Sequence, residues 1–196
     1  MSRSIFNIRT IAAIMVTTVI ISCGGDSANT TASNSDNDTT ATPMSMTAAD
    51  DDQLVAANIA RFDTLDFNIF NRRDWDRFHE NHAEDVIVHF PDGHSTKGLK
   101  KHIEDMEAMF VYAPDTRITS HDIKIGQGNI TAVTGVMEGT FTEPMPDGKG
   151  GFIKPTGKKF KIPMSTFSIW NDDGKMSEEY LYWDNKAYMT QMGLGQ

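Results

Sequence analysis

Acidic and aromatic side chains gather near the end of the chain, in residues 178–191. Successive side chains of a strand point to opposite faces, so the even-numbered residues from Glu178 to Asp184 share one face. That face carries two tyrosines and ends in a carboxylate. If the face is buried, the lack of water around Asp184 raises the pKa of its carboxyl and suits it to carry protons near neutral pH. We therefore predict Asp184 as a catalytic acid–base residue.

Asp184 also has a purely structural interpretation. It directly precedes a predicted helix over residues 185–192, and an aspartate at that position accepts a hydrogen bond from a backbone N–H of the first turn. Such a cap does not exclude catalysis, so both roles stay open.

Other kinds of catalytic site find little support in the residue pattern. His79 and His82 are three residues apart and share a helix face, but no third ligand follows at a spacing known for zinc. The sequence has neither a glycine-rich phosphate loop that opens a helix nor a Gly-x-Ser-x-Gly nucleophile elbow. We expect no metal site and no cofactor.

The N-terminal residues have the features of an export signal. Arg3 and Arg9 precede the uncharged run 11–21, which is too short for a comfortable membrane span. The run ends in Ile-Ile-Ser-Cys, which resembles the bacterial lipobox, and Cys23 is the only cysteine. We predict a signal peptide over residues 1–22, lipidation of Cys23, and a disordered tether over residues 23–49 that is too poor in apolar residues to fold. The protein is thus expected to be exported and lipid-anchored to a bacterial cell envelope membrane.

Residues 50–196 have the length of one domain. The chain carries a formal net charge of −9, which argues against nucleic acid as a partner and favours a neutral or cationic small ligand. Apolar residues at helical spacing predict helices over 50–70 and 99–110, with a shorter helix that Asp74 caps. Strands are predicted over 85–90, 117–125, 130–141, 158–170 and 175–184. Helices followed by a run of antiparallel strands indicate an α+β fold in which helices cover one face of a curved sheet.

The domain resembles the SnoaL-like ester cyclase (polyketide cyclase) family, part of the nuclear transport factor two-like (cystatin-like) superfamily. The similarity covers nearly all of residues 50–196 and rests on short stretches in the right order. These are Asp74-Trp75, His82-Ala83-Glu84-Asp85, Pro91-Asp92-Gly93, Thr96-Lys97-Gly98, residues 135–141, residues 155–160, Glu178-Glu179-Tyr180 and Trp183-Asp184-Asn185. The resemblance implies a cone of helices and curved sheet around a pocket, and the scaffold hosts several activities.

The resemblance also implies a cofactor-free intramolecular aldol condensation, with an aspartate on the last strand as general acid–base residue. That aspartate matches Asp184. The chemistry needs donors that steady an enolate, and His89, His121, Tyr180 and Tyr182 are candidates. Each has a plain structural alternative, since His89 and His121 can be satisfied histidines and the tyrosines can be sheet aromatics.

Several further residues are expected to line the pocket. His82 and Asp85 flank the entry to the first strand, from which side chains can reach the mouth of such a cone. The large apolar residues are most simply core residues, some of which must line any cavity. The predicted lining is Trp75, His82, Asp85, Phe110, Phe141, Met164, Tyr180 and Tyr182.

Two classes of function stay open. One is an acid–base enzyme of cyclase, isomerase or hydrolase type that acts on an apolar carbonyl compound. The other is a non-catalytic lipoprotein that binds an apolar small molecule. The expected partners are that small molecule, the membrane through the N-terminal lipid and, in a homodimer, a second copy of the chain.

Overall fold

The computed structural model describes residues 47–195. The predicted signal peptide, Cys23 and most of the predicted tether lie outside the described residues. The tether was expected to reach residue 49, but Thr47 caps the first helix and Ala48 and Ala49 belong to it, so its C-terminal boundary was placed too late. Within residues 47–195, no helix is long and apolar enough to cross a membrane.

The first helix, α1 (Ala48–Thr64), begins with a capping box. The Thr47 hydroxyl accepts a hydrogen bond from the backbone N–H of Asp50, and the Asp50 carboxylate accepts one from the backbone N–H of Thr47. The helix runs directly into a π-helical turn, η1 (Leu65–Ile69), and a 3-10 turn, η2 (Phe70–Arg72). A π turn adds a residue to the local helical repeat and re-aims the side chains around it, which is why such turns often occur at functional sites.

The remaining helical segments match the predicted pattern in part. The helix α2 (Leu99–Tyr112) confirms the prediction over residues 99–110, and α3 (Asn185–Gln191) confirms the short C-terminal helix. The predicted helix after Asp74 is instead a 3-10 helix, η3 (Trp75–Glu80), and Asp74 makes no side-chain cap hydrogen bond there.

Six strands form one sheet in the order β2-β1-β8-β7-β4-β3. Their bounds are β1 (His82–His89), β2 (Ser95–Lys97), β3 (Arg117–Gln127), β4 (Ile130–Thr140), β7 (Lys159–Trp170) and β8 (Met176–Trp183). All neighbours are antiparallel except β1 and β8, which pair in parallel. A separate two-stranded pair, β5 (Met145–Pro146) and β6 (Phe152–Ile153), lies in the long loop between β4 and β7.

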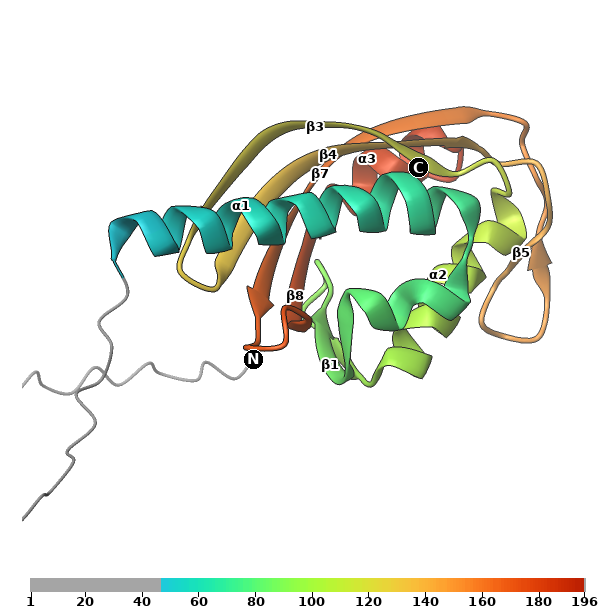
Figure 1. The fold of residues 1–196 in the computed structure, drawn as a ribbon. Helices are drawn as coiled ribbons and strands as arrows, with labels where there is room; N and C mark the ends of the chain where they lie inside the picture. The colour runs from blue at the N-terminus through green and yellow to red at the C-terminus, as the bar shows by residue number, and fades with distance from the viewer. Residues whose placement is uncertain (1–46, 196) are drawn as a thin grey trace, which may run out of the picture. The chain divides into compact units, whose positions relative to one another are not determined.

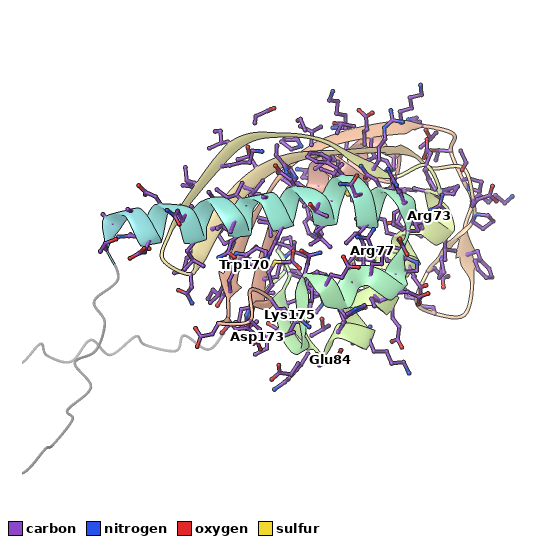
Figure 2. All side chains as sticks on the ribbon, in the orientation of Figure 1. Arg73, Arg77, Glu84, Trp170, Asp173 and Lys175 are labelled. Atoms are coloured by element: carbon purple, nitrogen blue, oxygen red, sulfur yellow. The ribbon has the colours of Figure 1, made fainter. Side chains whose placement is uncertain are left out.

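The sheet curves around the helical layer. In Figure 1 the strands β3, β4 and β7 arch over α1, while α2 lies beside the π and 3-10 turns. Figure 2 labels Trp170 below α1 in this view, near the lower ends of the strands. Trp170 is 1% exposed and its indole N–H donates a 2.9 Å hydrogen bond to the Thr131 hydroxyl. The α+β fold with a curved, mostly antiparallel sheet is therefore confirmed.

Candidate active site

A cavity of about 280 Å³ lies between the helical layer and the inner face of the sheet. Its walls come from α1, the helical turns, α2, α3 and the strands β3, β4, β7 and β8, and most of the lining side chains are aliphatic or aromatic. Seven lining residues carry polar or ionisable groups: Asp66, His102, Asp105, Tyr112, Thr166, Glu179 and Tyr188. A mostly apolar pocket with a few convergent polar groups is the usual form of a small-molecule site.

Asp66 reaches the cavity from the π turn and is held by a chain of charged groups. Its carboxylate accepts a hydrogen bond from Nε2 of His121 at 2.8 Å, and Nδ1 of His121 donates to Asp63 at 2.8 Å. The second carboxylate oxygen of Asp63 accepts from Lys124 at 2.7 Å. The His121 side chain is 1% exposed and packs against the rings of Phe62 and Phe67.

The pKa values of these groups reflect opposing effects. Burial raises the pKa of Asp66 above its ordinary value, although the hydrogen bond from His121 acts the other way. Burial disfavours the charged form of His121, but its bonds to Asp66 and Asp63 outweigh this and raise the pKa of His121. For Asp63 too, burial acts to raise the pKa, but the bonds from His121 and Lys124 prevail and lower it. The carboxyl group of Asp66 therefore contacts a proton donor, His121, on one side and the apolar cavity on the other.

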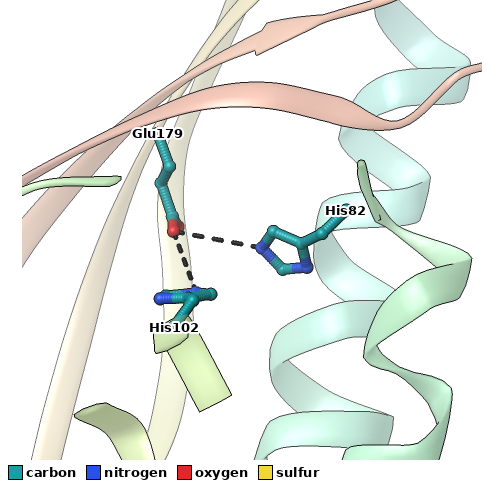
Figure 3. A group of neighbouring side chains, drawn as sticks. All are labelled: His82, His102 and Glu179. Carbon is teal, nitrogen blue, oxygen red and sulfur yellow. Dashed lines mark ion pairs between the residues drawn. The ribbon is translucent and has the colours of Figure 1, made fainter. Parts of the chain in front are cut away.

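Glu179 forms a second polar group on the cavity wall. Oε2 of Glu179 lies 3.3 Å from Nε2 of His102 and 3.9 Å from Nε2 of His82, and all three residues are buried (Figure 3). Burial raises the pKa of Glu179 to about 8, and the charge of Asp66 adds to this effect. Burial lowers the pKa of His102 to about 4. Burial also lowers the pKa of His82 well below its ordinary value, and the nearby His102 adds to this effect.

Asp184 lies outside this cavity. Its side chain is exposed and accepts a 2.9 Å hydrogen bond from the backbone N–H of Ala187, so the cap interpretation is confirmed. The condition on which its raised pKa depended, a buried face, is not met, because the cavity is lined by Glu179, Leu181 and Trp183 of the opposite face of β8. Asp184 borders only a shallow surface depression, and its catalytic role stays a prediction.

The two predicted catalytic histidines have different positions. His89 lies on the outer side of the sheet, stacked on Tyr180 at 4.1 Å and 3.3 Å from Oε2 of Glu178. His121 does not line the cavity but bonds to Asp66, which does. Irregular register between β3 and β4 on both sides of His121 turns its side chain inward. Ile123, on the same predicted face, is 58% exposed.

Of the predicted lining residues, Met164 lines the cavity. Trp75, Phe110 and Phe141 pack in the core and do not line the cavity. Trp75 and Phe110 pack against Phe70, and Phe141 packs against Tyr112, and both of these rings do line it. His82 lies behind the wall, against Glu179.

The remaining predicted lining residues face solvent. Asp85 is exposed and forms a 3.9 Å ion pair with Lys97. Tyr180 and Tyr182 follow the outer face of β8, where Tyr180 donates to Glu178 at 2.8 Å and Tyr182 is 50% exposed. These three are therefore not lining residues of this cavity.

The sequence held a signal for the residues that we missed. Asp66 falls within the apolar stripe of the first helix, next to Leu65, and His102 lies beside Ile103 in the apolar stripe of α2. Glu179 shares its strand face with Leu181 and Trp183. An ionisable residue at an apolar position of a buried face is a candidate for a functional site.

Comparison with known proteins agrees with this architecture. The family model for the SnoaL-like polyketide cyclase matches residues 62–192, and the chain belongs to that family. The comparison with curated proteins found no match.

Several solved structures share the fold. A candidate SnoaL-like polyketide cyclase from Jannaschia sp. is 18% identical, with a TM-score of 0.62 over 72% of this chain and 94% of the other. IdmH, a candidate polyketide cyclase from Streptomyces antibioticus, is 23% identical, with a TM-score of 0.57 over 71% and 98%. A third, from Xanthomonas campestris, is 18% identical, with a TM-score of 0.58 over 71% and 97%. At these identities the likeness shows the fold.

Proposed function

We propose that this protein is an acid–base enzyme of cyclase or isomerase type that acts on an apolar carbonyl compound in the cavity, with Asp66 as the group that carries the proton. The observation that supports this most is the Asp66 carboxylate on the wall of a mostly apolar cavity, where it accepts a 2.8 Å hydrogen bond from Nε2 of His121. Membership of the SnoaL-like polyketide cyclase family supports the same class of reaction.

In the proposed reaction, Asp66 removes a proton from the carbon next to the substrate carbonyl. The C–H bond breaks, its electron pair moves into the C–C bond, and the carbonyl oxygen takes up the negative charge. The enolate carbon then attacks a second carbonyl carbon, or takes a proton back at another position, and Asp66 returns the proton to the resulting alkoxide or carbon. No electrons are gained or lost overall, so this step needs no oxidant or reductant.

The surroundings of Asp66 suit this task. A carboxylate near an apolar cavity has little competing water, which strengthens its interaction with the substrate proton. His121 fixes the orientation of the carboxylate and balances its charge, as the third group of a catalytic relay does. The hydroxyl groups of Tyr112 and Tyr188, which lie 3.1 Å apart on the cavity wall, are available as donors to the enolate oxygen.

The first test is ligand binding in this cavity. A set of apolar ketones and esters is screened by thermal shift on the wild type, and the best ligand is then titrated by calorimetry. Ala108 lies on the exposed side of α2 yet lines the cavity, so Ala108→Trp narrows the cavity with little effect on the core. We expect this variant to bind the ligand roughly tenfold more weakly, since overfilling a packed site costs about 1–3 kcal/mol.

The second part of the test separates binding from turnover. Asp66→Asn keeps the shape of the side chain but removes its acid–base function, so it should bind the ligand and leave it unchanged. Asp184→Asn is the matched control, because it makes the same exchange at an exposed carboxylate. A ligand that binds equally well to Ala108→Trp would contradict the proposed site. A ligand that the wild type binds and never converts would identify a binding protein instead.

We further propose that the protein is an exported lipoprotein, anchored through Cys23. The support is the sequence alone: a basic N-terminus, an apolar run, and Ile-Ile-Ser before the single cysteine. In that location the substrate would be a compound outside the cytoplasm.

A further inference from the structure

Three buried side chains from distant parts of the chain meet at one point on the cavity wall. His82 begins β1, His102 lies in α2 and Glu179 lies in β8. Their side chains are at most 6% exposed, and they point toward one another in Figure 3. The proton transfer proposed above does not use His82, and it does not need Glu179 as a base.

The polar atoms of this cluster lack ordinary partners. Among residues 47–195, Nε2 of His82, Nδ1 of His102 and Oε2 of Glu179 are buried atoms without a hydrogen bond. Nδ1 of His82 lies 3.3 Å from the carbonyl oxygen of Phe78, so Nδ1 carries the hydrogen and Nε2 presents a lone pair. Buried polar groups are nearly always satisfied. The electron-rich atoms Nε2 of His82 and Oε2 of Glu179 face each other at 3.9 Å, an arrangement that either a proton on Glu179 or a bound metal ion would satisfy.

We propose that His82, His102 and Glu179 bind a divalent transition-metal ion of the Zn²⁺ class. One ligand atom from each residue lies within 4.8 Å of the other two. Ligand atoms around a tetrahedral ion at about 2.0–2.1 Å are roughly 3.4 Å apart. The measured separations from Glu179 are 3.3 and 3.9 Å, so the three atoms need only small side-chain rotations to surround an ion.

The ligand types select the class of ion. Two imidazole nitrogens and one carboxylate suit zinc and its first-row neighbours such as Fe²⁺ and Co²⁺, whereas Ca²⁺ and Mg²⁺ prefer oxygen ligands. A ligating histidine usually donates its other N–H to a carbonyl or carboxylate, as Nδ1 of His82 does to Phe78.

Three protein ligands leave a fourth position, which is the arrangement of catalytic rather than structural zinc sites. Since His102 and Glu179 line the cavity, an ion has a route of access to them from it. If the proposed function holds, a substrate carbonyl oxygen bound there would be polarised, which makes the neighbouring C–H bond more acidic. The binding of the ion itself does not depend on that function.

The test is a metal titration of the full chain after removal of metal with a chelator. Zn²⁺ binding is followed by calorimetry, and Co²⁺ binding by the intensity of its visible absorption, which is high for four-coordinate sites. We expect one ion per chain and a rise in melting temperature with Zn²⁺. Glu179→Gln and His102→Gln should each weaken binding by roughly tenfold or more, since even outer-shell partners of metal sites contribute about 10–100-fold.

Two controls make the result specific. His89→Gln removes a histidine that contacts a carboxylate outside the cluster, and Cys23→Ser removes the only thiol. Both variants should bind Zn²⁺ as the wild type does. His82→Asn is included only if its melting curve shows a folded protein, because this residue is fully enclosed.

Absence of stoichiometric Zn²⁺ or Co²⁺ binding would overturn the proposal and leave a proton between the three groups. Binding that persists in both Glu179→Gln and His102→Gln would also overturn it. The titration contains no carbonyl compound. A negative result would therefore exclude the metal site without bearing on the proposed role of Asp66.

Discussion

The buried contact between Asp66 and His121 should make His121→Phe strongly destabilising. The new ring fits beside Phe62 and Phe67, which already pack against His121, so the loss comes from the missing donor rather than from a cavity. A net hydrogen bond to a charged group contributes about 1.5–3 kcal/mol. The contact between His121 and Asp63 contributes about 0–1 kcal/mol, because the Asp63 side chain is 30% exposed and keeps its ion pair with Lys124 in the variant.

The sum predicts a loss of roughly 1.5–4 kcal/mol in the free energy of unfolding. For a domain of this size that corresponds to a fall in melting temperature of roughly 3–16 °C. The double variant Asp66→Leu/His121→Phe should recover at least half of the loss, because replacing both partners by apolar groups leaves no buried charge without a partner. Urea unfolding of the wild type and both variants measures these differences.

The contribution of Asp66 and His121 to stability should depend on pH in a definite direction. Both Asp66 and His121 have raised pKa values, so the folded state holds protons that the unfolded state releases. The pair contributes its whole stabilisation at a pH below the pKa values of the unfolded state. This stabilisation is lost as the pH rises through the higher pKa values of the folded state. Between pH 5 and 9, the advantage of the wild type over the double variant should therefore shrink. A single-variant loss below about 1 kcal/mol, or a double variant no more stable than the single one, would refute the reasoning.

Three further predictions concern other parts of the chain. Asp184→Ala should lose about 1 kcal/mol of unfolding free energy and Asp184→Asn almost none, since asparagine caps helices as well as aspartate does. Urea unfolding measures both losses, and a large loss in both variants would contradict the cap. Gly139→Ala places a methyl carbon 2.6 Å from Cζ of the buried Phe160, so denaturation should show a loss of about 1–3 kcal/mol, and an unchanged midpoint would contradict this packing. Cys23→Ser should move the protein from the membrane to the soluble fraction on cell fractionation, and unchanged partition would exclude the proposed anchor.

Local patterns predicted the fold well where neighbours in sequence are neighbours in space. The apolar spacing from Leu99 to Phe110 predicted α2, and the strands predicted over residues 117–125 and 130–141 correspond to the hairpin of β3 and β4. The parallel pairing of β1 with β8 was not predicted, because its partners, such as Val88 and Glu179, are about 90 residues apart in the chain. Alternation along a strand carries no information about such a distant partner.

The same lack of information about distant partners explains why the residues of the candidate site were not predicted. Alternation correctly separated Glu178 from Glu179 on β8, but the choice of the inner face depends on which way the whole sheet curves. The inward turn of Asp66 comes from the π-helical turn after α1, which the apolar spacing did not predict. His82, His102 and Glu179 come from three elements, so no spacing within one segment could unite them.

Proton exchange at a carbon atom tests the role of Asp66 most directly. A ketone that binds in the cavity is incubated in deuterium oxide with the wild type, Asp66→Asn or Asp184→Asn, and the loss of the signal of the proton next to its carbonyl is followed by NMR. We predict that Asp66→Asn slows the exchange by roughly 100-fold or more with affinity changed by less than about threefold, and that Asp184→Asn exchanges at the wild-type rate. Exchange that persists in Asp66→Asn, or that stops in Asp184→Asn, would contradict the assignment of Asp66 as the proton carrier.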